Sequence, residues 1–198
     1  MISLIFKPVP FLEEKLNTTF SITKPLVIIV SKTLLQNLSL LYLMFYIIKF
    51  FGSEGNILLV FFIIFFIMTL LLNITVWFAS SGIAYILISK TTKDIKFNKI
   101  FELMGYGFMP FMIGALISSI YNMYLISQVN FEAVSLKLMP DLLAQTLIFS
   151  DWFTICEVIF ILWGGYIWFN IFKMYNIKKP LLVISTPLAI MVIIKIFS

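Results

Sequence analysis

Histidine and arginine are both absent from this chain of 198 residues, and Cys156 is its only cysteine. These absences exclude haem ligation by histidine, zinc sites built from histidine or several cysteines, nucleophiles activated by histidine, and an intramolecular disulfide. Carboxylates, lysine, serine and tyrosine are the reactive groups that remain. We therefore predict no catalytic residues, no metal site and no cofactor, and we do not expect an enzyme.

Charged residues are also scarce, at 12% of the chain against roughly 25% in an average soluble domain. Hydrophobic residues make up 62% of the sequence, and the mean hydropathy is +1.08. The net charge of +5 comes from lysine alone. In a membrane protein such an excess reports loop orientation and contact with anionic lipid. The composition predicts an integral membrane protein whose partner is the lipid bilayer and which does not bind nucleic acid.

Five apolar runs are long enough to cross a hydrocarbon core of roughly 30 Å. They predict an all-α, polytopic bundle with five transmembrane helices, at about residues 25–51, 57–89, 97–121, 151–175 and 180–197. The second run would make a straight helix of about 50 Å. It therefore either tilts and projects from the membrane or breaks near Asn73 and the small residues at 79–84. We favour a single helix.

Residues 1–24 precede the first apolar run and mix prolines with charged residues. Their apolar side chains can form a stripe along a short helix, made up of Phe11, Leu12, Leu16 and Phe20. We predict an amphipathic segment that lies on the membrane surface, followed by a five-helix membrane domain over residues 25–198. Because this stretch has no cleavable signal pattern, the first membrane helix is expected to serve as the targeting signal.

The placement of lysine predicts the orientation of the helices. With the amino terminus inside, ten lysines fall in the inner segments, namely Lys7, Lys15, Lys24, Lys90, Lys93, Lys96, Lys99, Lys173, Lys178 and Lys179. Three fall in the outer segments, namely Lys49, Lys137 and Lys195. Because cytoplasmic loops carry the excess of basic residues, we predict a cytoplasmic amino terminus and an external carboxyl terminus, in the cell membrane.

The third run holds the most unusual local sequence, and we expect the other helices to be arranged around it. Pro110 lies in its middle, where proline removes a backbone donor and pushes against the preceding turn. The carbonyl near Tyr106 then needs another partner, for which a serine hydroxyl on a neighbouring helix is one candidate. Gly114 and Ser118 are small residues four apart, which allow another helix to approach closely.

Five polar residues within the predicted spans are candidates for a functional site. Glu157 is a carboxylate that could serve a proton or ion role, although a position about 9 Å from the outer end of its helix favours an interfacial or interhelical contact. Lys32 is expected to reach anionic headgroups near the inner face, and so not to meet Glu157. Asn73, Ser80 and Ser81 could line a polar pathway, but hydrogen bonds between helices are the commoner use.

Three stretches resemble the Yip1 domain family of small polytopic membrane proteins. They are the apolar, proline-containing start at 6–14, the sequence from Tyr106 to Pro110 followed by Gly114, and the span with Gly164 and Gly165 in its middle. The resemblance implies a five-helix membrane domain with a cytoplasmic amino terminus. Eukaryotic members are associated with vesicle traffic and with small GTPases, through an added soluble amino-terminal region. No binding residue is carried over from them.

These observations favour a non-enzymatic membrane-organising or scaffold protein of the trafficking type. One alternative is a small permease or ion pathway that uses the intramembrane polar residues. Another is an accessory subunit of a larger membrane complex. Other membrane proteins, or further copies of this chain, are the expected partners. A continuous cavity joining Glu157 to Asn73 or to the serine pair would favour the permease.

Overall fold

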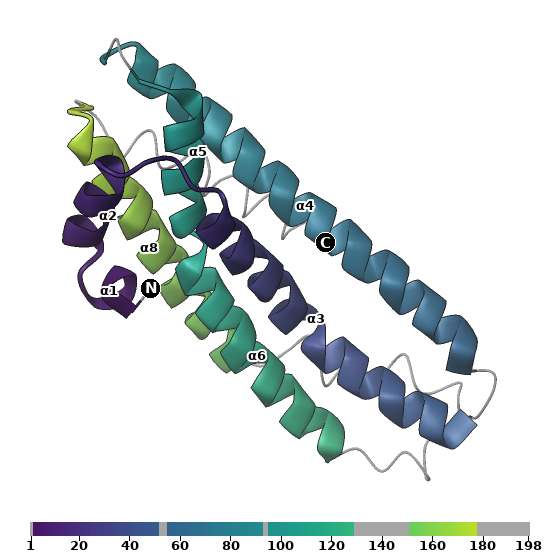
Figure 1. The fold of residues 1–198 in the computed structure, drawn as a ribbon. Helices are drawn as coiled ribbons and strands as arrows, with labels where there is room; N and C mark the ends of the chain where they lie inside the picture. The colour runs from purple at the N-terminus through teal and green to yellow at the C-terminus, as the bar shows by residue number, and fades with distance from the viewer. Residues whose placement is uncertain (1, 52–54, 93–94, 129–150, 178–198) are drawn as a thin grey trace.

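The computed structural model describes residues 2–51, 55–92, 95–128 and 151–177. These residues form helices and no strand. The helices are α1 (Ile2–Phe6), α2 (Pro8–Leu16), α3 (Thr23–Phe51), α4 (Gly55–Ser89), α5 (Phe97–Tyr106), α6 (Met109–Ser127) and α8 (Asp151–Met174). Helix α3 packs against α4 and α6, and α6 packs against α8 (Figure 1). The predicted all-α bundle is confirmed.

Three helical stretches are long and apolar enough to cross a membrane: Thr23–Tyr46, Leu59–Ser89 and Phe97–Ser127. Helix α8 corresponds to the fourth predicted span, and its apolar part, Val158–Met174, is shorter. The fifth predicted span, residues 180–197, lies outside the described residues. Five crossings therefore remain a prediction, while three spans are supported by length and composition.

The long second run forms one helix, as we favoured. Helix α4 is continuous over 35 residues, from Gly55 to Ser89. The hydroxyls of Thr75, Ser80 and Ser81 each donate a hydrogen bond to a carbonyl four residues earlier, at 2.8, 2.6 and 2.7 Å. Because these hydroxyls bond along their own helix, Ser80 and Ser81 can be buried without a break in α4.

The third run is two helices rather than one helix interrupted at Pro110. Helix α5 ends at Tyr106, α6 begins at Met109, and Pro110 lies in the first turn of α6. Proline suits that position, because the first amides of a helix have no intrahelical partner. The break lies before the proline, at Gly107 and Phe108, whose amides bond to the carbonyls three residues back at 3.1 and 3.2 Å. Our expectation of a proline in mid-helix was wrong.

The broken span is the most enclosed of the three. Within an apolar stretch of 18 residues in this span 56% of the residues are buried, against 33% for Thr23–Tyr46 and 17% for Leu59–Ser89. Several fully buried side chains lie at the break or just before it, among them Leu103, Met104, Tyr106 and Phe108. The two short helices therefore lie at the centre of the core, and α4 lies at its edge.

The amino-terminal helices pack on the bundle. Leu4, Phe11 and Leu12 are buried, and helix α2 contacts both α5 and α8. The Phe11 ring meets the Tyr106 ring edge-on, with 5.1 Å between centroids. The predicted apolar stripe is thus used largely against protein, whereas Phe20 at its end is 42% exposed. A position of this segment on the membrane surface remains a prediction.

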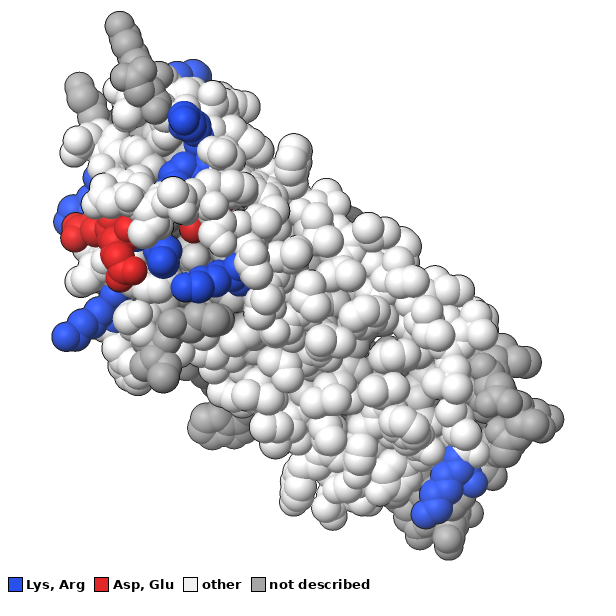
Figure 2. Space-filling model, viewed as in Figure 1, with Lys and Arg blue, Asp and Glu red and all other residues white. Residues whose placement is uncertain are grey.

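Charged side chains gather at the two ends of the molecule, and the flank between them is uncharged (Figure 2). At one end lie α1, α2, the end of α4, the start of α5 and the end of α8 (Figure 1). At the opposite end, the basic side chain among the described residues is Lys49, in the last turn of α3. The described segments that we assigned to the inner face therefore share one end. This arrangement fits a bundle that spans a bilayer.

Candidate functional site

A polar cluster joins α3 and α4 inside the bundle, and it contains two of the predicted candidates. The Lys32 ammonium donates a hydrogen bond to Asn73 Oδ1 at 2.5 Å. Asn73 Nδ2 donates to Thr33 Oγ1 at 3.0 Å, and Thr33 Oγ1 donates to the Ile29 carbonyl at 2.9 Å. Asn37 Nδ2 adds a bond to the Thr33 carbonyl at 2.8 Å. These linked bonds fasten the two helices together.

Lys32 points into the bundle, contrary to our expectation that it reaches the headgroups. Its Nζ lies 5.9 Å from the centroid of the Phe108 ring, at the break between α5 and α6. An aromatic face attracts a cation at such a distance. Among the described residues two ion pairs form, and neither includes Lys32. The Lys32 ammonium is therefore stabilised by an amide oxygen and an aromatic ring, and by no carboxylate among the described residues.

The other predicted polar residues are placed differently. Ser80 and Ser81 are buried and donate to the carbonyls of Val76 and Trp77, within their own helix. They are therefore not joined by hydrogen bonds to the Lys32 cluster. Glu157 belongs to α8, but its side chain lies outside the described part of the structure. Its predicted separation from Lys32 stays a prediction.

Two tryptophans bind the backbone where α5 ends. Trp168 Nε1 on α8 donates to the Met104 carbonyl at 3.0 Å, and Trp77 Nε1 on α4 donates to the Phe101 carbonyl at 2.8 Å. Trp77 also stacks on the Phe101 ring, with centroids 3.9 Å apart. We expected a serine hydroxyl to satisfy a freed carbonyl in this region. Indole N–H groups from two neighbouring helices bind carbonyls there instead.

Close contacts accompany these bonds. Gly107 lies so near the Trp168 indole that a Cβ atom at this position would overlap the ring. Gly114 lies against Phe160 of α8, whose ring would come within 2.8 Å of an added Cβ. Ser118 is partly buried, and its neighbour Ser119 donates a hydrogen bond to the Leu35 carbonyl of α3. Small residues thus bring α6 close to α8 on one side and to α3 on another.

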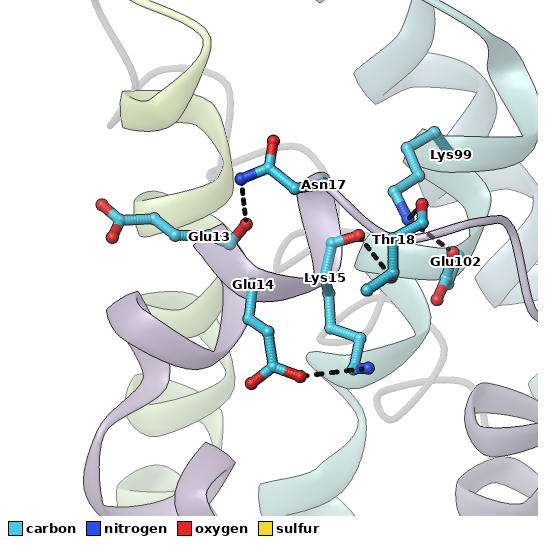
Figure 3. Close-up of polar contacts among 7 residues, drawn as sticks. All are labelled: Glu13, Glu14, Lys15, Asn17, Thr18, Lys99 and Glu102. Carbon is cyan, nitrogen blue, oxygen red and sulfur yellow. Dashed lines mark hydrogen bonds and ion pairs between the residues drawn. The ribbon is translucent and has the colours of Figure 1, made fainter.

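A buried carboxylate lies at the charged end of the bundle. Glu102 is 1% exposed, and its Oε2 accepts from Lys99 Nζ at 3.0 Å and from the Ser21 amide at 3.3 Å. Lys99 Nζ also donates to the Thr18 carbonyl at 3.1 Å. Figure 3 shows Lys99 between Glu102 and the turn that follows α2. The pair therefore fastens the amino-terminal segment to α5.

The comparison with known proteins agrees with this architecture of apolar helices. The sequence pattern of the Yip1 domain matches residues 2–197. This chain belongs to the Yip1 domain family. No curated protein and no solved structure gives a significant match.

Three contacts of this Yip1-family bundle were missed by sequence reasoning. They are the indole bonds of Trp77 and Trp168 and the buried ion pair of Glu102. A signal existed for the last, because Lys99 precedes Glu102 by three residues, a spacing that brings side chains together on a helix. The described residues also contain no group of three or more potential metal-ligating side chains. Chemically, the arrangement holds helices together.

Proposed function

We propose that this Yip1-family membrane protein is a non-enzymatic scaffold of the trafficking type. It organises the bilayer through contacts with lipid, with other membrane proteins or with further copies of itself. The observation that carries the proposal is the use of polar groups within the spans. Lys32, Asn73 and Thr33 bond to one another between helices, and Ser80 and Ser81 bond to their own helix. The first three groups join α3 to α4 and the two serines bond within α4, which supports a structural use of these groups over a path for a solute.

The outer surface of α4 supports contacts within the bilayer. This helix packs against α3 and α5, and many of its large apolar side chains are exposed, including Phe61, Phe65, Met68 and Phe78. Such a surface suits acyl chains or an apolar helix of another protein. The proposed orientation places the amino terminus in the cytoplasm, with the lysine-rich end of the bundle on that side of the cell membrane.

Flux and association measured on the same vesicles test this proposal. The purified chain is reconstituted into phosphatidylcholine vesicles, and proton and potassium flux is compared with that of empty vesicles. Energy transfer between two fluorescently labelled pools of the protein reports association. We expect no added flux and clear energy transfer at low protein density.

Two outcomes would contradict the scaffold. A flux that the wild type supports and that Asn73→Leu abolishes would favour the permease. The scaffold would also be contradicted if energy transfer is absent and no other protein stays bound to the chain after mild extraction from native membranes. A scaffold must associate either with its own copies or with other proteins. A partner that is retained in a fixed ratio would instead favour an accessory subunit.

A further inference from the structure

A pocket of about 580 Å³ opens at the charged end of the bundle. Three segments that are distant in sequence line it: the turn after α2, the stretch leading into α5, and the residue after α8. The polar lining residues that matter here are Thr18, Thr19, Lys96, Asn98, Lys99 and Tyr175. Its volume lies within the range of about 300–1,000 Å³ that small-molecule sites occupy. Among the described residues that line it there is no carboxylate.

Tyr175 lines the pocket, and its hydroxyl has no hydrogen-bond partner among the described residues. The residue is 9% exposed, and its hydroxyl is buried with no hydrogen bond among the described residues. A tyrosine phenol keeps its proton at neutral pH and can therefore donate. A buried polar group without a partner is costly, which indicates that something else completes its hydrogen bond.

The start of α5 supplies further donors. No side chain caps this helix, and its first turn contains no acidic residue. The amides of Phe97 and Asn98 come before the first intrahelical bonds and donate to no other described residue. Such amides can bind an anion, and the helix end carries partial positive charge. Lys96 precedes the helix and is exposed. Lys99 Nζ uses two of its three N–H groups on Thr18 and Glu102, which leaves one.

We propose that this pocket binds the phosphate of a small phosphate ester, with the amides at the start of α5, the Lys96 ammonium and the Tyr175 hydroxyl as donors. The phosphate could belong to an anionic phospholipid headgroup or to a soluble ester, because both present the same oxyanion. Each donor fits a phosphate oxygen, since amides at a helix start, lysine and hydroxyls all bind such oxygens. The proposal does not depend on the scaffold role.

Direct binding to the full chain tests the pocket. The protein is placed in phosphatidylcholine nanodiscs that contain graded amounts of phosphatidic acid, and bound phosphatidic acid is counted by native mass spectrometry. We expect Lys96→Gln and Tyr175→Phe each to weaken binding by about tenfold. The matched controls are Lys173→Gln and Tyr166→Phe, which alter exposed residues of α8 that do not line the pocket. We expect less than a twofold change for both.

Glycerol 3-phosphate and inorganic phosphate separate the two sources of phosphate. They are titrated onto the protein in nanodiscs of phosphatidylcholine alone, and the shift in melting temperature is recorded. Binding of phosphatidic acid that these solutes do not displace would assign the site to a lipid. Binding of the solutes, lost in Lys96→Gln and Tyr175→Phe, would assign it to a soluble ester and also support the pocket. The proposal is overturned if no probe binds, or if the pocket variants behave as their controls do.

Folding does not obscure the result, because neither pocket variant removes a recorded bond. Lys96 is exposed, and the Tyr175 hydroxyl has no partner among the described residues. Tyr175→Phe removes an unpaired buried hydroxyl, so the unliganded variant should melt at or above the wild-type temperature. Lost binding combined with retained stability therefore reports the site itself.

Discussion

Gly107→Ala should destabilise the protein by crowding Trp168. The backbone of Gly107 has φ −63° and ψ −14°, which alanine adopts freely, so the substitution brings no backbone strain. The Cβ atom would, however, overlap three atoms of the indole ring. That ring is fully buried, donates to the Met104 carbonyl, and packs against Phe108 at 5.7 Å between centroids. It has little room to withdraw.

The magnitude follows from two losses and one gain. Overpacking a filled core costs about 1–3 kcal/mol, and pulling the indole off its carbonyl loses about 0.5–1.5 kcal/mol. Alanine lowers the conformational entropy of the unfolded chain, which stabilises the folded state by about 0.4–1 kcal/mol. We expect a net loss of about 0.5–4 kcal/mol, which lowers the melting temperature by roughly 1–16 °C.

Gly82→Ala is the matched control, because a Cβ at Gly82 has nothing within 4 Å. It lies inside α4 and should be neutral or stabilise by about 0.5–1 kcal/mol. Both variants are heated in the same detergent. Size-exclusion chromatography then measures the fraction of each protein that remains monodisperse. A second test adds Trp168→Phe to Gly107→Ala, because the smaller ring should leave room for the new methyl group and make the double variant more stable than additivity predicts. Equal melting of the two glycine variants, or strict additivity, would refute the crowding of Trp168.

Three further variants are measured in the same melting assay. Pro110→Ala should change the melting temperature by no more than a few degrees, because the proline occupies a first-turn position where no donor is needed; a large loss would show that it shapes the break. Asn73→Leu should destabilise more than Lys32→Met, because the first leaves a buried cation unpaired and the second removes it; the reverse order would show that Lys32 is solvated. Glu102→Gln should lower the melting temperature equally at low and high salt, because its ion pair with Lys99 is largely buried and poorly screened; a loss that salt abolishes would place the pair in solvent.

Much of the fold follows from local sequence. The run from Gly55 to Ser89 forms one helix because its serine hydroxyls can donate hydrogen bonds to carbonyls of the preceding turn. These bonds require no other segment of the chain. The disturbance near Pro110 could likewise be located to within a few residues. Its form could not, because a proline pattern alone does not distinguish a kink from a new helix start. Gly107 and Phe108 decide for the latter, because their amides bond three residues back.

Contacts between distant residues were the part that sequence could not supply. Trp168 reaches a carbonyl 64 residues away, and nothing in its immediate surroundings indicates which carbonyl. Lys32 was predicted near the headgroups by counting along one helix. Its real partner, Asn73, depends on how α4 lies along α3, and no pattern within either helix fixes that register.

The Lys32 cluster and the Trp168 contact also meet at one residue, and this connects the two halves of the bundle. Phe108 lies near the Lys32 ammonium on one side and packs edge-on against Trp168 on the other. An unbroken helix would direct residue 108 elsewhere, because each residue advances the direction of the side chain by about 100°. The break at Gly107 therefore places one aromatic ring between α3 and α8. Gly107 and Phe108 interrupt a transmembrane helix, and this interruption allows both α3 and α8 to pack against it.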